Sequence, residues 1–333
     1  MPRELREMEW RGNILVLSGG DGPEREISLM SGHAVADALE SIGARVRFED
    51  VRSMTEALSR VRATSCCAFV ALHGCWGEDG RLQVLLESEG LVYTGSGPRA
   101  CMLAMDKWTS KAVFCQAGVP VPSGFCVPSR FDEDDIFRCR EFLAQTGKIV
   151  VKPRSCGSTV GFSIVSGESA LRDALSLVAA FDEDAIVEEY VDGDEIAVTV
   201  LGHGKDVLAL PPVMIRPRKG IYDYDSKYTA GATEYLTPPP LAADVLERIC
   251  DAAVAAHAAL GCSVYSRVDL RLTPGGTPKV FEVNAVPGMT ATSLVPKAAA
   301  AASLSFGDLL GRIVDSSVEE RKRERNDVPG TVR

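Results

Sequence analysis

The sequence has no long hydrophobic run, and this absence argues against a membrane protein. No apolar stretch approaches the roughly 18–20 residues that a membrane-spanning helix requires. The alanine-rich stretch at Lys297–Ala302 is short and carries a lysine. The first residues, Met1–Gly12, have charges of both signs and no apolar core, unlike a secretory signal. We therefore expect a cytoplasmic protein with no membrane partner.

Cysteine pairs at metal-binding spacing are also missing. The chain has 10 cysteines, but none form a Cys-x-x-Cys pair, and Cys66 and Cys67 are adjacent. Thiols of a cytosolic protein are normally reduced and pack as small hydrophobic side chains. A structural zinc site is therefore the less favoured interpretation of these residues.

Basic residues are fewer than acidic ones. Lys and Arg number 36 against 46 Asp and Glu, so the net charge is −10. A nucleic-acid-binding protein usually carries a basic patch. Here the basic cluster Arg321–Arg325 is interleaved with acidic residues. We expect no nucleic-acid partner, and we interpret residues 319–333 as a charged tail that is solvated and frayed.

The composition is that of a globular protein. In the first hundred residues, short apolar runs typical of strands alternate with segments whose apolar residues have helical spacing. The chain has 333 residues, 46% hydrophobic and 25% charged, which is enough for two or three domains. Short apolar runs alternate with helical spacing, which predicts an α/β unit with a parallel sheet. The predicted strands are Asn13–Ser18, Val46–Phe48 and Ala68–Leu72, and the predicted helices are Ile27–Ile42 and Met54–Val61.

A second unit begins near Thr94–Gly97, and from Glu195 the pattern is mostly β. The predicted helices are Ala100–Ala117, Ala170–Ala180, Leu241–Leu260 and Phe306–Val314. The predicted strands are Lys148–Lys152, Ser163–Val165, Ala185–Tyr190, Ile196–Leu201, Val207–Leu210, Val213–Ile215, Val264–Leu272 and Lys279–Val283. The segment Lys219–Pro240 reads as a loop, and a loop this long in a compact domain is usually functional or disordered.

The strongest chemical pattern lies in the last two predicted strands. Arg267 and Asp269 alternate on one strand, and Glu282 and Asn284 alternate on the next. Alternate residues share a face of a strand, so all four converge if the strands pair. Two carboxylates and an amide oxygen suit Mg²⁺ bound to phosphates, and an arginine beside them suits a phosphate or an oxyanion. A surface network of ion pairs is the alternative.

A second pattern is the segment Lys152–Gly161, in which a lysine ends a strand and small residues follow. Small side chains let backbone N–H groups approach phosphate oxygens. A plain Gly/Ser hairpin is the alternative. His73 follows the strand Ala68–Leu72 at its carboxyl end, where ligands bind in open α/β sheets. A structural histidine explains that position equally well.

Together these motifs resemble the D-alanine–D-alanine ligases. The resemblance extends in order from about Asn13 to Val314. It implies an ATP-grasp fold, α+β in the C-terminal half, with an N-terminal Rossmann-like parallel α/β domain. It implies domains at 1–95, 96–190 and 191–318, with a substrate lid at 219–240. The motifs are GGDGPEREISL at 19–29, ALHG at 71–74, EDG at 78–80, YTGS at 93–96, AMDK at 104–107, VKP at 151–153, YDYDSKY at 222–228, RVD at 267–269 and EVNAVPGMT at 282–290.

The resemblance also implies roles for individual residues. It implies that the ATP contacts are Lys107, Lys152, Gly157, Ser158, Thr159, Val160, Glu188, Val191, Glu195 and Lys227. It implies that two Mg²⁺ ions, or Mn²⁺ in their place, are held by Asp269, Glu282 and Asn284. It implies that catalysis involves Glu24, Ser158, Tyr228, Arg267 and Gly288. It implies that D-alanine contacts Glu24, His73, Lys227, Tyr228, Arg267, Gly288, Ser293 and Leu294.

The implied reaction joins two D-alanines through D-alanyl phosphate, for peptidoglycan precursor synthesis. The implied assembly is a homodimer. One alternative is a ligase that makes D-alanyl-D-serine or D-alanyl-D-lactate, and a depsipeptide ligase would be expected to lack Tyr228. The other is a non-catalytic nucleotide-binding protein on the same fold, which would be expected to lack Arg267 or a metal ligand. All of these residues are present.

Overall fold

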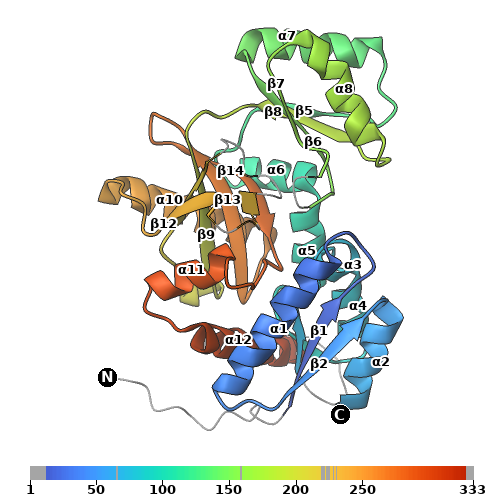
Figure 1. Cartoon of the computed structure of the whole chain (residues 1–333), viewed down its shortest axis with the longest axis vertical. Coiled ribbons are helices and arrows are strands. Elements are labelled where there is room, and N and C mark those ends of the chain that lie inside the picture. Colours follow the sequence, from blue (N-terminus) through green and yellow to red (C-terminus); the bar gives the residue numbers. More distant parts are fainter. Residues whose placement is uncertain are drawn as a thin grey trace.

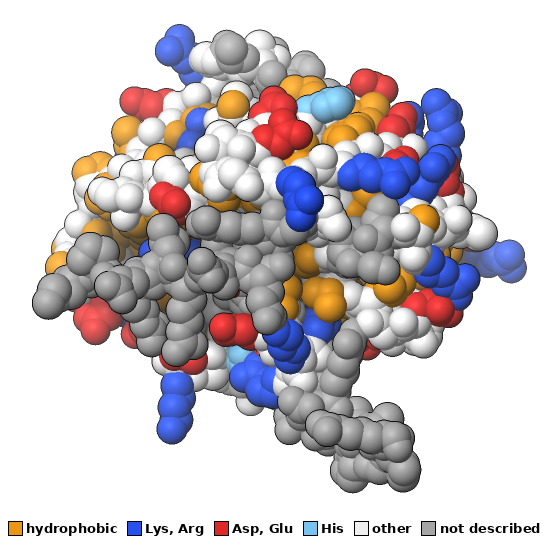
Figure 2. All heavy atoms as spheres, turned by 90° about the horizontal axis from the view of Figure 1, so that it is seen from below, with side chains coloured by type: hydrophobic (Ala, Val, Ile, Leu, Met, Phe, Trp, Pro, Cys, Tyr) orange, Lys and Arg blue, Asp and Glu red, His pale blue; other side chains and the backbone are white. Residues whose placement is uncertain are grey.

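The computed structural model describes residues 13–64, 67–157, 160–218, 222, 226–227, 229 and 231–327. Its strands form three sheets, which follow one another along the chain (Figure 1). No helix among the described residues is long and apolar enough to cross a membrane. On the face shown in Figure 2, acidic and basic side chains are interspersed.

The first sheet is parallel, as predicted. Its strand order is β2-β1-β3-β4, and all three strand pairs are parallel. Residues Ile14–Leu17 of β1 are almost completely buried, because helices cover both faces of the sheet. Its strands are β1 (Ile14–Gly19), β2 (Val46–Val51), β3 (Cys67–Val70) and β4 (Val92–Tyr93). Its helices are α1 (Arg25–Ser41), α2 (Met54–Thr64), α3 (Cys75–Glu78) and α4 (Arg81–Ser88).

The single helix predicted over Ala100–Ala117 is wrong, because the structure has two helices there. They are α5 (Pro98–Met105) and α6 (Lys107–Gln116), separated by Asp106 in an extended conformation. The Asp106 carboxylate accepts a hydrogen bond from the backbone N–H of Thr109 at 3.0 Å, which caps the new helix. The break places Lys107 in the first turn of α6.

The second sheet is antiparallel, in the order β5-β8-β6-β7. Helices α7 and α8 pack on one of its faces (Figure 1), and Val151 and Val187 point into that core. The predicted strands and the second of these helices are confirmed, whereas the sequence analysis missed β5 and α7. The elements are β5 (Gly124–Val127), α7 (Glu133–Thr146), β6 (Ile149–Pro153), β7 (Ser163–Val165), α8 (Glu168–Ala179) and β8 (Ala185–Glu189).

The third sheet has the order β12-β11-β9-β13-β14, and β10 pairs with β9. Helix α10 (Ala243–Leu260) packs against it. The strands are β9 (Asp194–Leu201), β10 (Leu208–Ala209), β11 (Val213–Pro217), β12 (Thr233–Leu236), β13 (Tyr265–Leu272) and β14 (Pro278–Asn284). Strand β12 lies inside the predicted loop Lys219–Pro240, so that segment is not entirely irregular.

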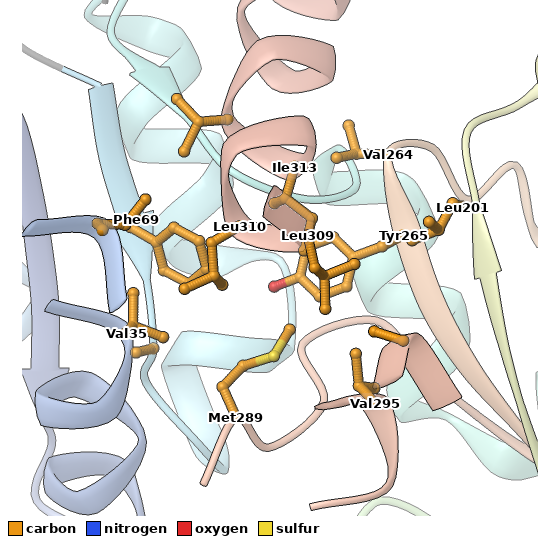
Figure 3. Packing of buried hydrophobic residues seen from close by; sticks show 14 of the residues in the cluster. Val35, Phe69, Leu201, Val264, Tyr265, Met289, Val295, Leu309, Leu310 and Ile313 are labelled. Carbon is orange, nitrogen blue, oxygen red and sulfur yellow. The ribbon is translucent and has the colours of Figure 1, made fainter. Parts of the chain in front are cut away.

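The first and third sheets share one hydrophobic core. Figure 3 shows Val35 and Phe69 of the first unit directed toward the same centre as Tyr265 and Leu309 of the third. Such a continuous core fixes the two units relative to each other. Helices α11 (Leu294–Ala301) and α12 (Phe306–Asp327) complete this side of the molecule.

Helix α12 runs well past the predicted end at Val314, so the prediction of a frayed tail is wrong for residues 319–327. Arg321 is only 3% exposed. Its guanidinium donates to the carbonyl oxygen of Gly95 at 2.8 Å and to a carboxylate oxygen of Glu87 at 3.1 Å. It also lies 4.2 Å from the centre of the Tyr93 ring. These partners belong to the first unit, and no local sequence pattern reveals them.

Candidate active site

A large cleft lies where the three units meet. Its empty space, including the part open to solvent, is about 1910 Å³. The predicted site residues that line it are Glu24, His73, Lys107, Lys152, Gly157, Val160, Glu188, Val191, Glu195, Lys227, Arg267, Asp269, Glu282, Asn284, Gly288, Ser293 and Leu294. The remaining three, Ser158, Thr159 and Tyr228, lie outside the described residues.

The floor of the cleft is the antiparallel pair β13 and β14. Asp269 lies directly opposite Glu282, and Arg267 lies directly opposite Asn284. The Arg267 guanidinium donates to both carboxylate oxygens of Asp269, with Nε–Oδ1 and Nη2–Oδ2 distances of 2.8 Å. Burial lowers the pKa of Arg267, but Asp269 raises it further, so the guanidinium keeps its charge.

A β-bulge gives β14 two consecutive side chains on the cleft side. The register shifts between Asp269 and Leu270, whose partner is Val280, so Phe281 is the extra residue. Phe281 and Glu282 therefore both line the cleft. The Phe281 ring lies 5.4 Å from the ammonium of Lys152. The alternation on which the sequence analysis relied does not reveal this bulge.

The roof of the cleft is the uncovered face of the second sheet. Glu188 is buried there between two lysines, with Oε1 at 2.6 Å from Nζ of Lys152 and Oε2 at 2.5 Å from Nζ of Lys111. Burial raises the pKa of Glu188, but the two ammonium groups lower it more, so its net pKa is below the usual value. Sequence reasoning missed Lys111, although it lies one helical turn beyond Lys107.

Lys107 reaches the segment that follows β6. Its Nζ donates to the carbonyl oxygen of Cys156 at 2.7 Å, and its backbone N–H donates to the carbonyl oxygen of Arg154 at 3.1 Å. Lys152 lies on the same β6 end. The two lysines of the predicted phosphate site therefore approach the same segment from different elements.

The carboxylate of Glu195, on β9, also lines the cleft. Its Oε2 accepts a hydrogen bond from Arg271 at 3.2 Å, and Arg271 also donates to the carbonyl oxygen of Gly193. Burial raises the pKa of Glu195 more than Arg271 lowers it. Val191, nearby in the chain, is buried and lines the same cleft. Arg271 was missed, although it continues the alternation of Arg267 and Asp269 on β13.

Glu24, at the start of α1, lines the cleft from the first unit. A Cβ on Gly74 would lie 2.3 Å from Oε2 of Glu24, and Gly74 has φ +72°. Glycine suits that backbone conformation, and a side chain there would displace the Glu24 carboxylate. A Cβ on Gly157 would lie 3.4 Å from the same oxygen. Glu24 thus lies between the first unit and the small-residue segment after β6.

His73 also lines the cleft from the first unit, and both of its ring nitrogens have a hydrogen-bonding partner. Nδ1 is 3.3 Å from Oε1 of Glu78, and Nε2 is 2.8 Å from Oγ of Ser31. The backbone N–H of Met289, next to Gly288, also donates to Oγ of Ser31 at 3.3 Å. The buried hydroxyl of Ser31 therefore links His73 to the loop that carries Gly288. Sequence reasoning missed Ser31.

The segment predicted as a lid contributes Lys227 to the cleft. Burial lowers the pKa of Lys227, and so does nearby Arg267, while the facing carboxylates raise it. Its ammonium lies 5.2 Å from the centre of the Tyr222 ring. A buried amine of this kind is suited to an anionic ligand. Ser293 and Leu294 line the cleft at the start of α11.

Metal binding depends on the donors that this floor offers. No three His, Cys, Asp or Glu side chains cluster as a metal site in the described part of the chain. Asp269 and Glu282 are nevertheless paired across the strands, and Asn284 adds an amide oxygen. The Glu282 side chain makes no hydrogen bond or salt bridge to another described residue, while Lys107 and Lys152 lower its pKa against the effect of burial. Hard, ionised oxygens of this kind fit Mg²⁺ shared with phosphates.

Comparison with known proteins identifies the family. Residues 115–315 match the family described as D-ala D-ala ligase C-terminus. A D-alanine–D-alanine ligase of Gloeobacter violaceus is 43% identical over 314 residues, which cover 92% of this chain and 99% of that protein.

Solved structures agree with this assignment. The D-alanine–D-alanine ligase of Bacillus anthracis complexed with ATP superposes with a TM-score of 0.79 at 32% identity, covering 94% of this chain and 98% of that one. A D-alanine:D-serine ligase of Enterococcus faecalis has a TM-score of 0.78 at 28% identity, covering 92% and 99%. The chain therefore belongs to the D-alanine–D-alanine ligase family, an ATP-dependent ligase family with the ATP-grasp fold.

Proposed function

We propose that this chain joins two molecules of D-alanine into D-alanyl-D-alanine, using ATP and releasing ADP and phosphate. The product would serve peptidoglycan precursor synthesis. The observation that carries this proposal is the pairing of Asp269 with Glu282 on the floor of a cleft that also holds Lys107, Lys152 and Glu24. This arrangement places groups suited to a triphosphate beside a carboxylate suited to an amino acid's ammonium.

The chemistry explains why both sets of groups are needed. A free carboxylate does not condense with an amine, because its leaving group is poor. In the first step a carboxylate oxygen of one D-alanine attacks the γ-phosphorus of ATP, and the bond to the β–γ bridging oxygen breaks to release ADP. In the second step the amine of the other D-alanine attacks the resulting acyl phosphate, loses a proton, and phosphate leaves.

The first step requires charge neutralisation and alignment more than covalent help. Lys107 and Lys152 would supply positive charge to the phosphates, with the loop Gly157–Val160 over them. Asp269, Glu282 and Asn284 would hold Mg²⁺, which neutralises phosphate charge when bound. Glu188, Val191 and Glu195 would contact the nucleoside.

The second step requires donors for a developing oxyanion. Arg267, held in place by Asp269, and the backbone N–H of Gly288 would supply them. Glu24 would receive the ammonium of the first D-alanine, with His73 near this substrate. Ser158 and Tyr228 would act as hydrogen-bonding partners in the closed site. Lys227, Ser293 and Leu294 would contact the second D-alanine.

Phosphate release with defined substrates tests the proposal. Purified protein is incubated with ATP, Mg²⁺ and D-alanine alone, and then with D-serine or D-lactate added. Phosphate release and a dipeptide of two D-alanines with D-alanine alone would support the proposal. Turnover only in the mixtures would reject it in favour of a D-alanyl-D-serine or D-alanyl-D-lactate ligase. ATP binding without turnover in any mixture would favour a non-catalytic protein.

We further infer that the protein is a cytoplasmic homodimer. The support is the likeness to the family, whose substrate ATP is a cytoplasmic metabolite. Light scattering of the purified protein measures the mass directly. A mass near twice the 35.6 kDa of the chain would support the dimer, and a mass near 35.6 kDa would reject it.

A further inference from the structure

A polar junction connects the second-sheet unit, residues 124–189, to the rest of the molecule. Three ion pairs cross it: Arg154 with Asp106, Lys111 with Glu188, and Lys279 with Glu189. Glu188, Glu189 and their neighbours line the cleft. Arg154 does not line it, so direct contact with a ligand does not explain the first of these pairs.

The Arg154–Asp106 pair has the geometry of a fork. Nε of Arg154 donates to Oδ1 of Asp106 at 2.8 Å, and Nη2 donates to Oδ2 at 2.6 Å. Two parallel, charge-assisted bonds fix orientation as well as distance. The pair is partly buried, with side-chain exposures of 33% and 26%. Asp184 lies at 3.5 Å from Nη1 of the same guanidinium.

The same carboxylate also begins helix α6. Asp106 accepts hydrogen bonds from the backbone N–H of Thr109 at 3.0 Å and from its hydroxyl at 2.8 Å. Because Asp106 is fixed at the helix start, Arg154 is anchored to the frame of α6. Backbone contact reinforces this, since the N–H of Lys107 donates to the carbonyl oxygen of Arg154.

The two partners of this anchor are close in the chain to the two lysines of the cleft. Lys107 follows Asp106 directly, and Lys152 precedes Arg154 by two residues on β6. The two lysines belong to different units, so their relative position depends on how those units are joined. In addition to the hydrogen bond from its backbone N–H, Lys107 donates from its side-chain Nζ to the carbonyl oxygen of Cys156, in the segment after Arg154.

We propose that Arg154 is a positioning residue for ATP: its fork onto Asp106 sets Lys107 relative to Lys152 and holds the segment Arg154–Gly157 against α6. The proposal rests on the proposed function for the identity of the ligand. Lysine at this position would keep the charge but would not make two parallel bonds in one plane. The two parallel hydrogen bonds of the fork, and not the positive charge alone, are therefore what positions Lys107 relative to Lys152.

Equilibrium binding of ATP tests the proposal without requiring turnover. The variants are Arg154→Met, Arg154→Lys and Asp106→Asn, with Arg172→Met as the matched control. Arg172 pairs with Glu133 at 2.7 Å in the same unit; both side chains are exposed, and neither residue lines the cleft. Asn at position 106 still caps a helix well, so that variant removes the charge of the pair while keeping a capping oxygen.

We expect Arg154→Met to weaken ATP binding about tenfold, which corresponds to about 1.4 kcal/mol. Arg154→Lys and Asp106→Asn should each weaken it several-fold, and the double variant Arg154→Met with Asp106→Asn should be no worse than Arg154→Met alone. Arg172→Met should leave the Kd of ATP within twofold of the wild-type value. In the active enzyme the KM for ATP should rise more than the KM for D-alanine.

A purely structural role would give a different pattern. It would lower the midpoint of thermal unfolding and the fraction of active protein, and so kcat, while the Kd and KM of ATP stayed unchanged. An ATP Kd within twofold of wild type in folded Arg154→Met, or in Arg154→Lys should Met fail to fold, would overturn the proposal. Wild-type protein that binds ATP but releases no phosphate with D-alanine would instead overturn the proposed function.

Discussion

Asp269 and Glu282 lie directly opposite each other on β13 and β14, and both side chains reach the same cleft. The two carboxylates differ in their hydrogen-bonding partners. Asp269 is occupied by Arg267 on both oxygens, whereas Glu282 makes no such pair within the described chain and lies among Lys107, Lys152, Arg267 and Lys227. Both oxygens of Glu282 are therefore open to a metal ion shared with phosphates, whereas Asp269 would bind the metal with oxygens that also accept from Arg267.

The first prediction concerns Glu282→Gln. The amide keeps the size of the side chain but removes the charge that would hold Mg²⁺ against the phosphates. We expect phosphate release with D-alanine to fall by about 10²-fold or more, the scale seen when electrostatic stabilisation of a transition state is lost. The midpoint of thermal unfolding should stay close to that of the wild type. The change keeps the size of the side chain and removes only one negative charge from beside the four surrounding cations.

The control is Glu247→Gln on the exposed side of α10, which makes the same chemical change away from the cleft. It should leave phosphate release unchanged. Folded Glu282→Gln protein with wild-type turnover would show that this carboxylate does not take part in metal or nucleotide binding.

The sequence could predict this floor because strand alternation is a local property. Arg267 and Asp269 share a face by spacing alone, and the short turn between the strands makes their pairing with Glu282 and Asn284 the simplest arrangement. The parallel first sheet followed in the same way from β1, whose continuous apolar run is typical of a strand that is buried on both faces.

Contacts between segments far apart in the chain could not be predicted in that way. Lys111 meets Glu188 across 77 positions, and Ser31 meets Met289 across 258. Periodicity reports which face of an element is buried, not which element covers it. The break at Asp106 was missed for a different reason: the apolar spacing continues through it, and only the capping side chain marks the new helix.

The second prediction concerns Ser31→Ala. This change removes the hydroxyl that holds Nε2 of His73 and the backbone N–H of Met289, and a buried N–H without a partner is costly. We expect the KM for D-alanine to rise about tenfold, corresponding to about 1.4 kcal/mol, while the KM for ATP stays within twofold. Steady-state kinetics with each substrate varied in turn measures both.

Ser41→Ala serves as the control for Ser31→Ala. Ser41 is exposed at the end of the same helix, and its hydroxyl donates only to the local carbonyl oxygen of Ala38. Equal changes in the KM of both substrates for Ser31→Ala would indicate a general structural defect rather than an effect on the region around His73 that is proposed to bind D-alanine.

The third prediction concerns Arg321→Met in helix α12. The guanidinium is buried against Gly95, Glu87 and Tyr93, so its loss removes charged hydrogen bonds that join the C-terminal helix to the first unit. We expect the free energy of unfolding, measured with urea, to fall by about 2–3 kcal/mol. Arg312→Met, on the exposed face of the same helix, should change it by less than about 0.5 kcal/mol.

The fourth prediction concerns the pH dependence of stability at His257. Its imidazole is completely buried, with Nε2 2.9 Å from the carbonyl oxygen of Gly202 and Nδ1 2.7 Å from the hydroxyl of Ser266. These partners fit a neutral ring that donates from Nε2 to the carbonyl and accepts at Nδ1 from the hydroxyl. Burial lowers the pKa of His257 from 6.5 to about 4.

A lowered pKa means that the unfolded chain binds a proton at His257 before the folded chain does. The free energy of unfolding should therefore be unaffected by this group above pH 6.5, and should fall as the pH drops from 6.5 toward 4, by at most about 3 kcal/mol. Urea unfolding between pH 7.5 and 4.5 measures the slope. His257→Gln should flatten it, whereas the same change at exposed His33 serves as the control for removing an imidazole. An identical slope in His257→Gln and wild type would show that His257 takes up its proton equally in both states.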